Sequence, residues 1–276
     1  MITAIAPART AAPLAALLPA RRRTAWTVEP ATHYGIRPNA ALSRITDGTR
    51  TLLIAESAGV VEVFVVQVDV FPAVPAAVVD ANGPDPVAAL AARILRSVLP
   101  DLDKATANAT LVAHGWQQAV IDTAQEMNEV AYELIDHGAH LVVEPRTDGV
   151  GIHWQAPSTG GEWSLCAVGN GSVILGYEGP VSGLYGLLTA VLPTAEGRES
   201  TDVGSPFTRH LTDRFPQLRP VDSHEAEFGA KGEPHGFIAL PTSDEPTDVM
   251  DDSRRVAAQF HLFGADLLLS AVTHLV

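Results

Sequence analysis

The residues best suited to chemistry gather in one short stretch of the sequence, where His137, His140, Glu144 and His153 follow one another closely. If residues 148–149 form a two-residue turn, Glu144 lies directly opposite His153 on neighbouring strands. The alternation of side chains along a strand then puts His140 on the same face. Imidazole and carboxylate groups at one point of a sheet can hold a divalent metal or exchange protons with a substrate.

The same residues also have an ordinary structural explanation. A Glu144–His153 pair across two strands is common on a half-exposed sheet. His137 stands directly before a glycine, which is typical of the end of a helix. The sequence contains no H-E-x-x-H motif, in which two histidines bind zinc from one helix face. A divalent metal is therefore the one cofactor that the sequence leaves open, and no other cofactor is predicted.

Ser182 is a further candidate catalytic residue, at a predicted strand-to-helix junction. The nucleophile turn of a hydrolase requires G-x-S-x-G, whereas here glycine stands three positions before Ser182 and directly after it. A serine that caps a helix explains this position better. Cys166 is the only cysteine and lies between apolar residues of a predicted strand, where an inert thiol is expected.

These groups must be positioned by strands and helices. Their predicted order, runs of strands followed by helices, indicates an α+β fold with two antiparallel β-meanders, each followed by packing helices. The meanders cover about residues 41–71 and 140–178, the second with four strands. Asp-Gly or Asn-Gly dipeptides at 47–48, 148–149 and 170–171 are typical of type I′ hairpin turns. Apolar residues at three- and four-residue spacing predict an amphipathic helix over 115–136.

Three segments follow from this order of elements. Residues 1–23 are predicted as an N-terminal arm, 24–138 as a meander plus two helices, and 139–276 as the central meander plus helices. The last part, 256–276, is predicted as a long C-terminal helix. Its ionisable residues, such as Asp266 and His274, disfavour a membrane span.

Composition excludes some classes of partner. The chain of 276 residues carries a net charge of −14, which disfavours binding to nucleic acid or to anionic membranes. A hydrophobic fraction of 46% with 18% charged residues is typical of a globular protein. The start of the chain lacks the pattern of a secretory signal, so a cytoplasmic location is predicted. The excess of alanine and of arginine over lysine indicates a G+C-rich bacterial genome.

The absence of a catalytic motif favours a non-catalytic interaction protein: an adaptor, a chaperone-like, an immunity or an assembly component that acts through protein–protein contacts. The apolar segments 182–192 and 256–276 add a homodimer to the predicted partners. The alternative function is a metal-dependent hydrolase or lyase that uses His140, Glu144 and His153. A third hypothesis is a small-ligand-binding module with its pocket between the central sheet and the 182–192 helix.

Overall fold

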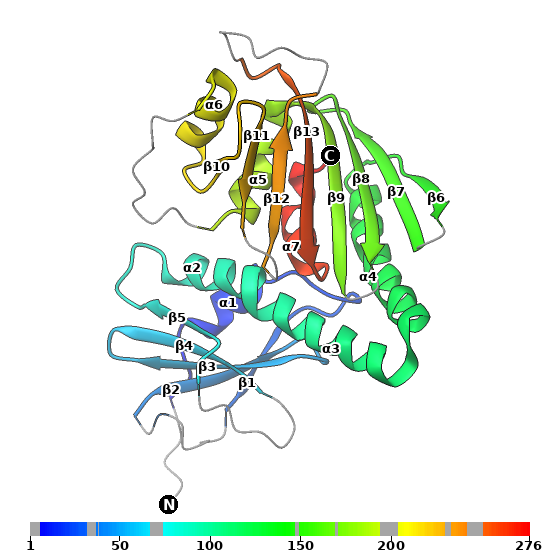
Figure 1. Ribbon diagram of the computed structural model, residues 1–276. Coiled ribbons are helices and arrows are strands. Elements are labelled where there is room, and N and C mark those ends of the chain that lie inside the picture. Colours follow the sequence, from blue (N-terminus) through cyan, green and yellow to red (C-terminus); the bar gives the residue numbers. More distant parts are fainter. Residues whose placement is uncertain are drawn as a thin grey trace, which may run out of the picture. The chain divides into compact units, whose positions relative to one another are not determined.

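The computed structural model describes residues 6–31, 37, 39–66, 74–146, 149–168, 171–193, 204–229, 233–241 and 251–276. The chain forms two compact units, Met1–Leu99 and Pro100–Val276, and each combines helices with an antiparallel sheet (Figure 1). The predicted α+β class is therefore confirmed.

The first unit is built on a five-stranded antiparallel sheet whose strands pair in sequence order. Its strands are β1 (Thr27–Pro30), β2 (Ala41–Thr46), β3 (Thr51–Ser57), β4 (Val60–Val65) and β5 (Ala77–Asp80), and helix α1 (Ala11–Leu17) precedes them. Successive residues from Leu52 to Ala55 are buried, so β3 is covered on both faces, as expected of a central strand. The predicted meander over 41–71 forms the middle of this sheet, and residues 67–73 lie outside the described part.

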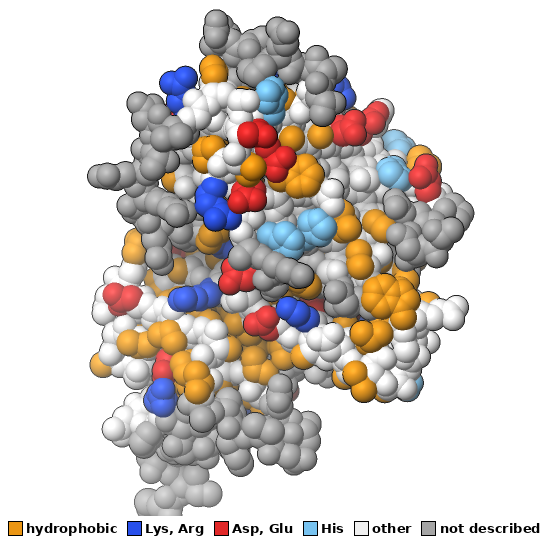
Figure 2. All heavy atoms as spheres, viewed as in Figure 1, with side chains coloured by type: hydrophobic (Ala, Val, Ile, Leu, Met, Phe, Trp, Pro, Cys, Tyr) orange, Lys and Arg blue, Asp and Glu red, His pale blue; other side chains and the backbone are white. Residues whose placement is uncertain are grey.

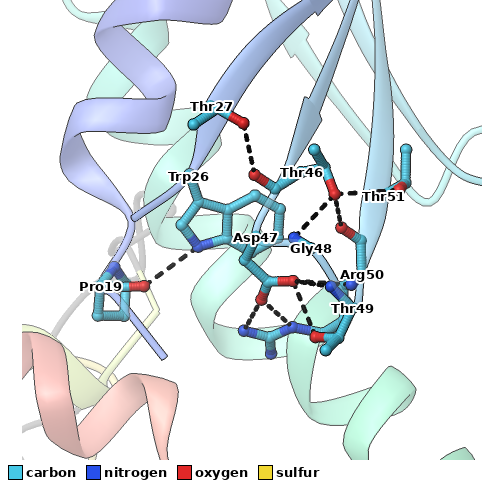
Figure 3. A network of polar contacts seen from close by, with 9 residues as sticks. All are labelled: Pro19, Trp26, Thr27, Thr46, Asp47, Gly48, Thr49, Arg50 and Thr51. Carbon is cyan, nitrogen blue, oxygen red and sulfur yellow. Dashed lines mark hydrogen bonds and ion pairs between the residues drawn. The ribbon is translucent and has the colours of Figure 1, made fainter. Parts of the chain in front are cut away.

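The Asp47 side chain holds the turn between β2 and β3 by hydrogen bonds (Figure 3). Thr46 lies opposite Thr51, so the loop comprises residues 47–50. The Asp47 carboxylate accepts hydrogen bonds from the amides of Thr49 (2.9 Å) and Arg50 (2.7 Å). The predicted type I′ turn is wrong, because it needs positive φ at two residues and Asp47 does not have it, whereas Gly48 does. The Asp47 side chain takes the place of a backbone acceptor instead.

A continuous helical stretch runs from Pro86 to His114. It comprises α2 (Pro86–Arg93), a π-helical segment (Ile94–Val98) and α3 (Leu99–His114). The side chain of Asp85 caps its start by accepting from the Ala88 amide, at 2.9 Å. Pro100 does not end the helix, although proline usually does. In the π-helical turn just before it, the Leu99 amide donates to the Ile94 carbonyl. This wider turn accommodates the proline ring and its lack of an amide hydrogen.

The second unit is built on an eight-stranded antiparallel sheet in the order β10-β11-β12-β13-β9-β8-β7-β6. The strands are β6 (Val142–Arg146), β7 (Gly149–Ala156), β8 (Gly161–Val168), β9 (Ser172–Pro180), β10 (Arg219–Pro220), β11 (Glu225–Phe228), β12 (His235–Ala239) and β13 (Arg255–Phe263). The helices are α4 (Trp116–Asp136), a 3-10 turn (Val181–Leu184), α5 (Tyr185–Val191), α6 (Pro206–Arg214), α7 (Asp266–Ala271) and a final 3-10 turn (Val272–His274). The four strands predicted within 140–178 are β6 to β9.

The long C-terminal helix predicted over 256–276 is wrong. Its first half is β13, which pairs with β9 on one side and β12 on the other. Val256, Ala258, Phe260 and Leu262 are buried at every second position, the period of a strand with one face in the core. Gly264, with a φ of 69°, ends the strand before the short helix α7.

Helices cover one face of the eight-stranded sheet. Figure 1 shows α4, α5 and α7 behind the strands, and the indole N–H of Trp154 in β7 donates to the Leu275 carbonyl at 2.7 Å on that side. α4, which was predicted to follow the first meander within residues 24–138, lies in this second unit, as do residues 100–114 of α3. Among the described residues, no helix is both long enough and apolar enough to cross a membrane.

Candidate functional site

The face of the eight-stranded sheet that points away from α4, α5 and α7 is the candidate site, and we call it the open face. It carries Ser164 of β8, Gly176 of β9 and Gln259 of β13. The strands alternate strictly: in β8, Trp163 and Leu165 are buried beneath the helices, whereas Ser164 between them is only half-buried. Because successive side chains of a strand point to opposite faces, the sheet has one face packed against helices and one face without a described helix.

One row of residues crosses the open face at right angles to the strands. His153 lies opposite Ser164, Ser164 opposite Gly176, Gly176 opposite Gln259, and Gln259 opposite Phe237. Adjacent strands lie about 4.8 Å apart, so the row from β7 to β12 is about 19 Å long. Three of the five residues come from the consecutive strands β7 to β9, and the other two come from β12 and β13, more than 50 positions further along the chain.

A shallow depression of about 360 Å³ follows this row. Its floor is low because the central side chains are small: Ser164, Gly176 and Ala257 stand where larger residues would fill the space. A Cβ atom on Gly176 would overlap the Ser164 hydroxyl, so the glycine lets the serine lie flat on the sheet. The apolar side chains of Phe237 and Ile174 also line the depression. The depression can hold side chains of a molecule that lies across the strands.

The two long sides of the depression differ in chemistry. On one side, Glu162 lies directly opposite Glu178, and both side chains are exposed. Glu162 accepts a hydrogen bond from Gln155 at 3.1 Å, whereas the Glu178 carboxylate forms no hydrogen bond or ion pair within the described part of the chain. On the other side, Ile174 lies opposite His261. Figure 2 looks onto the open face, where red carboxylates lie around a centre of white and orange atoms.

The His261 ring stacks on that of His235 from the neighbouring strand, with centroids 4.8 Å apart. Burial and the neighbouring His235 lower the pKa of His261 below its usual range. This imidazole therefore stays neutral at neutral pH, and its Nε2 lies 2.9 Å from the Gln259 amide nitrogen, from which it can accept a hydrogen bond.

Glu144 and His153 come together at one end of the open face. The Glu144 Oε2 atom lies 3.3 Å from His153 Nε2, and the side chains are 60% and 40% exposed. The register differs from the predicted one by two residues, because Arg146 pairs with Gly149; residues 147–148 lie outside the described part of the chain. A shift by an even number leaves every side chain on the same face, so the predicted common face is found although the pairing was wrong.

The other predicted site residues lie apart from this pair. His140 precedes β6 and is exposed. His137 places Nδ1 2.8 Å from the Glu133 carbonyl, as a residue at a helix end does. Within the described chain, no group of three or more His, Cys, Asp or Glu side chains is placed to hold a metal ion. Glu144 and His153 supply two ligands, and the metal site stays a prediction.

Ser182 lies in the 3-10 turn after β9, where its backbone amide donates to the Asp252 carbonyl at 3.1 Å. Its side chain does not cap α5, whose N-cap residue is Leu184. The capping explanation is therefore wrong, because the helix begins with a 3-10 turn that already contains the serine. No described histidine hydrogen-bonds to the Ser182 side chain.

Four polar side chains form a cluster that was not predicted from the sequence. The Tyr185 hydroxyl donates to Asp252 Oδ1 at 2.5 Å and lies 2.8 Å from His210 Nε2. The Arg214 guanidinium covers the Tyr185 ring, 4.0 Å from its centroid. Only His210 and Arg214, four positions apart on α6, leave a signal in the sequence, because Tyr185 and Asp252 are 67 positions apart.

Burial raises the pKa of Tyr185, and so do the hydrogen bond to Asp252 and its negative charge. The phenol therefore stays protonated over the ordinary pH range and acts as a hydrogen-bond donor, not as a base. The cluster joins α5, α6 and the turn before β13, which is a structural role.

Comparisons of the chain with models of protein families, with curated proteins and with solved structures find no match. Function is therefore inferred from the geometry of the chain itself.

Proposed function

We propose that this protein is a non-catalytic interaction protein that binds a partner polypeptide on the open face of its eight-stranded sheet. The observation that carries the proposal is the depression of about 360 Å³ across that face. An antiparallel sheet often leaves one face to solvent. Here, however, small residues at the centre, Ile174 at one side and Phe237 at the β12 end shape that face to receive side chains from outside.

A polypeptide suits this site better than a small molecule does. A small-ligand pocket encloses 70–90% or more of its ligand, whereas this depression is shallow and spans several strands. Interfaces between proteins are flatter and cover about 800 Å² on each partner. A pocket between the sheet and the 182–192 segment has less support, because Leu187, Leu188 and Val191 of α5 are buried.

The metal-dependent hydrolase has weaker support in the geometry. A catalytic zinc ion takes three protein ligands and one water, and of the four predicted ligands the described structure brings together Glu144 and His153 only. These two side chains are also well exposed, whereas catalytic groups usually lie in a cleft that excludes water.

Site-specific photocrosslinking in cells tests the proposal. A benzophenone amino acid is placed at Ser164, in the depression, and in a matched protein at Gln125, on the exposed side of α4. We expect one partner protein to be captured from Ser164 and not from Gln125. The substitution Ala257→Trp fills the depression and should lower this capture about tenfold, which corresponds to about 1.4 kcal/mol of binding energy.

Circular dichroism and thermal unfolding of the Ala257→Trp variant show whether it keeps the fold. Equal capture from the two positions, or full capture by a folded Ala257→Trp variant, contradicts binding on the open face.

A further inference from the structure

We infer that the segment bound on the open face is basic and amphipathic, with lysine or arginine side chains directed at Glu162 and Glu178 and apolar side chains directed at Ile174 and Phe237. This inference rests on the proposed function and adds the chemistry of the partner. It follows from the charges on the two sides of the depression.

The side of the depression formed by Glu162 and Glu178 carries two carboxylates and no described cation to neutralise them. Glu162 and Glu178 lie directly opposite each other on adjacent strands, and like charges in that position disfavour the sheet. No described cationic side chain forms an ion pair with either carboxylate. An ammonium or guanidinium group placed between them removes the repulsion and gains charge-assisted hydrogen bonds.

The open face as a whole is also negatively charged. Its described side chains include five glutamates: Glu144, Glu162, Glu178, Glu225 and Glu227. The described arginine side chains on this face are Arg219, which is paired with Glu227 at 3.0 Å, and Arg255 at the end of β13. An excess of carboxylates attracts a basic segment and speeds its association.

The opposite side of the depression selects apolar groups. Ile174 lies on the side away from the carboxylates, and Phe237 lies at the β12 end of the row. Both side chains are half-buried. The row of about 19 Å accommodates about six residues of an extended segment or about thirteen of a helix. A segment that lies along the row has one edge beside the carboxylates and meets Ile174 across the row and Phe237 at its end, so it must carry both basic and apolar side chains.

A second copy of this chain does not fit the same site. In a two-fold symmetric dimer, each open face meets an identical face, so the excess of carboxylates on one copy would meet the same excess on the other. Nucleic acid is disfavoured by the same negative charge.

Charge reversal tests the inference directly. The variant Glu162→Lys with Glu178→Lys is compared with the control Glu133→Lys with Asp136→Lys at the end of α4, which has the same net charge. A second variant, Glu162→Gln with Glu178→Gln, removes the charges with little change in shape. The probe is a fluorescent peptide of about fourteen lysine and leucine residues with helical periodicity, together with its glutamate–leucine analogue.

Fluorescence anisotropy gives the affinities at low and high salt. We expect the lysine–leucine peptide to bind the reversal variant about tenfold more weakly than the control variant, with the glutamine variant between them. High salt should weaken binding to the wild type, and the glutamate–leucine peptide should prefer the reversal variant. Equal affinity of the reversal and control variants for the lysine–leucine peptide overturns the inference.

The captured partner separates this inference from the proposed function. If capture from Ser164 is lost in Ala257→Trp but unchanged in the reversal variant, the open face binds its partner and the inferred basic chemistry is wrong. If capture is unchanged in both folded variants, the proposed function is wrong as well. Loss of capture in both, with the α4 control unaffected, supports both statements.

Discussion

At the scale of single residues, Asp47 shows how one side chain fixes the backbone of the first unit. Its carboxylate is fully buried, accepts two backbone hydrogen bonds and forms an ion pair with Arg50 at 2.7 Å. The Arg50 guanidinium also lies over the Trp26 ring, 5.3 Å from its centroid (Figure 3). Burial alone would raise the pKa of Asp47, but the hydrogen bonds from Arg50 and Thr49 and the charge of Arg50 outweigh it and lower the pKa.

The substitution Asp47→Asn should lower the free energy of unfolding by about 1–3 kcal/mol at neutral pH, because it removes the charge from these bonds. A carboxylate whose pKa is lowered on folding stabilises the native state above its ordinary pKa of 3.8, and this contribution is lost as the pH falls below that value. The difference between wild type and Asp47→Asn in urea unfolding should therefore shrink toward pH 3. Asp80→Asn, at an exposed turn, is the control, and an equal loss there contradicts the prediction.

Arg23 is a residue under backbone strain. Arg22 and Arg23 have φ values of 51° and 60° in a tight hairpin closed by the Arg21 and Thr24 amides. Residues with a Cβ atom avoid this region, at a cost of about 1–2 kcal/mol each. Arg23→Gly should therefore be more stable than Arg23→Ala by about 1 kcal/mol, in spite of the greater flexibility of glycine in the unfolded chain. Equal unfolding midpoints of the two variants would show that the turn is not strained.

At the scale of elements, glycines in neighbouring strands fix how Tyr177 packs. A Cβ atom on Gly161 of β8 would overlap the Tyr177 ring. The hydroxyl of this tyrosine donates to the Pro180 carbonyl at 2.7 Å, so the ring has little freedom to move. Gly161→Ala should therefore cost about 2–3 kcal/mol in thermal or urea unfolding.

Gly176→Ala is the matched control for this prediction, because its Cβ atom would meet the Ser164 hydroxyl, which can rotate away. It should cost less than about 1 kcal/mol. If the two variants lose the same stability, the Tyr177 ring is free to shift and the packing argument is wrong.

The contacts of Tyr185 hold three elements together. Tyr185→Phe removes the hydrogen bonds to Asp252 and His210 and should destabilise the second unit by about 1–2 kcal/mol. Because the cluster joins α5 to α6, hydrogen exchange should become faster in the amides of α6 first. Tyr132→Phe, on an exposed side chain of α4, should change neither quantity. Unchanged exchange in α6 would show that the cluster does not hold this helix.

At the scale of the whole molecule, the apolar segments that suggested a homodimer are used inside the second unit. Leu187 and Leu188 of α5 and Leu268 of α7 are fully buried. A net charge of −14 adds repulsion between copies. Sedimentation at micromolar concentration should therefore give the mass of one chain, 29.1 kDa. A mass twice as large would contradict this, and Trp116, which is 55% exposed on α4, would be the first residue to replace.

The sequence predicted local structure better than long-range pairing. The helix over 115–136 was confirmed because its apolar spacing repeats over many turns. Residues 256–263 alternate as a strand does, but their high apolar content was interpreted as a helix. The common face of Glu144 and His153 was predictable, since it depends only on even or odd spacing, whereas their register depends on the length of the connection between the two strands.

The depression could not be predicted, because it needs β9 to lie beside β13. That pairing places Gly176 opposite Gln259, and nothing local to either residue indicates it. The Tyr185–Asp252 contact likewise depends on segments that are distant in the sequence. In both cases the sequence supplies suitable residue types, and only the order of the strands brings them together.

The single cysteine of the chain also belongs to the open face, opposite Ile174. Cys166 is neither fully buried nor part of a disulfide, so one maleimide dye can mark this face without any substitution. The rate at which the thiol reacts then becomes a direct gauge of occupancy: a molecule seated across the strands shields the sulfur, and its release restores the reaction.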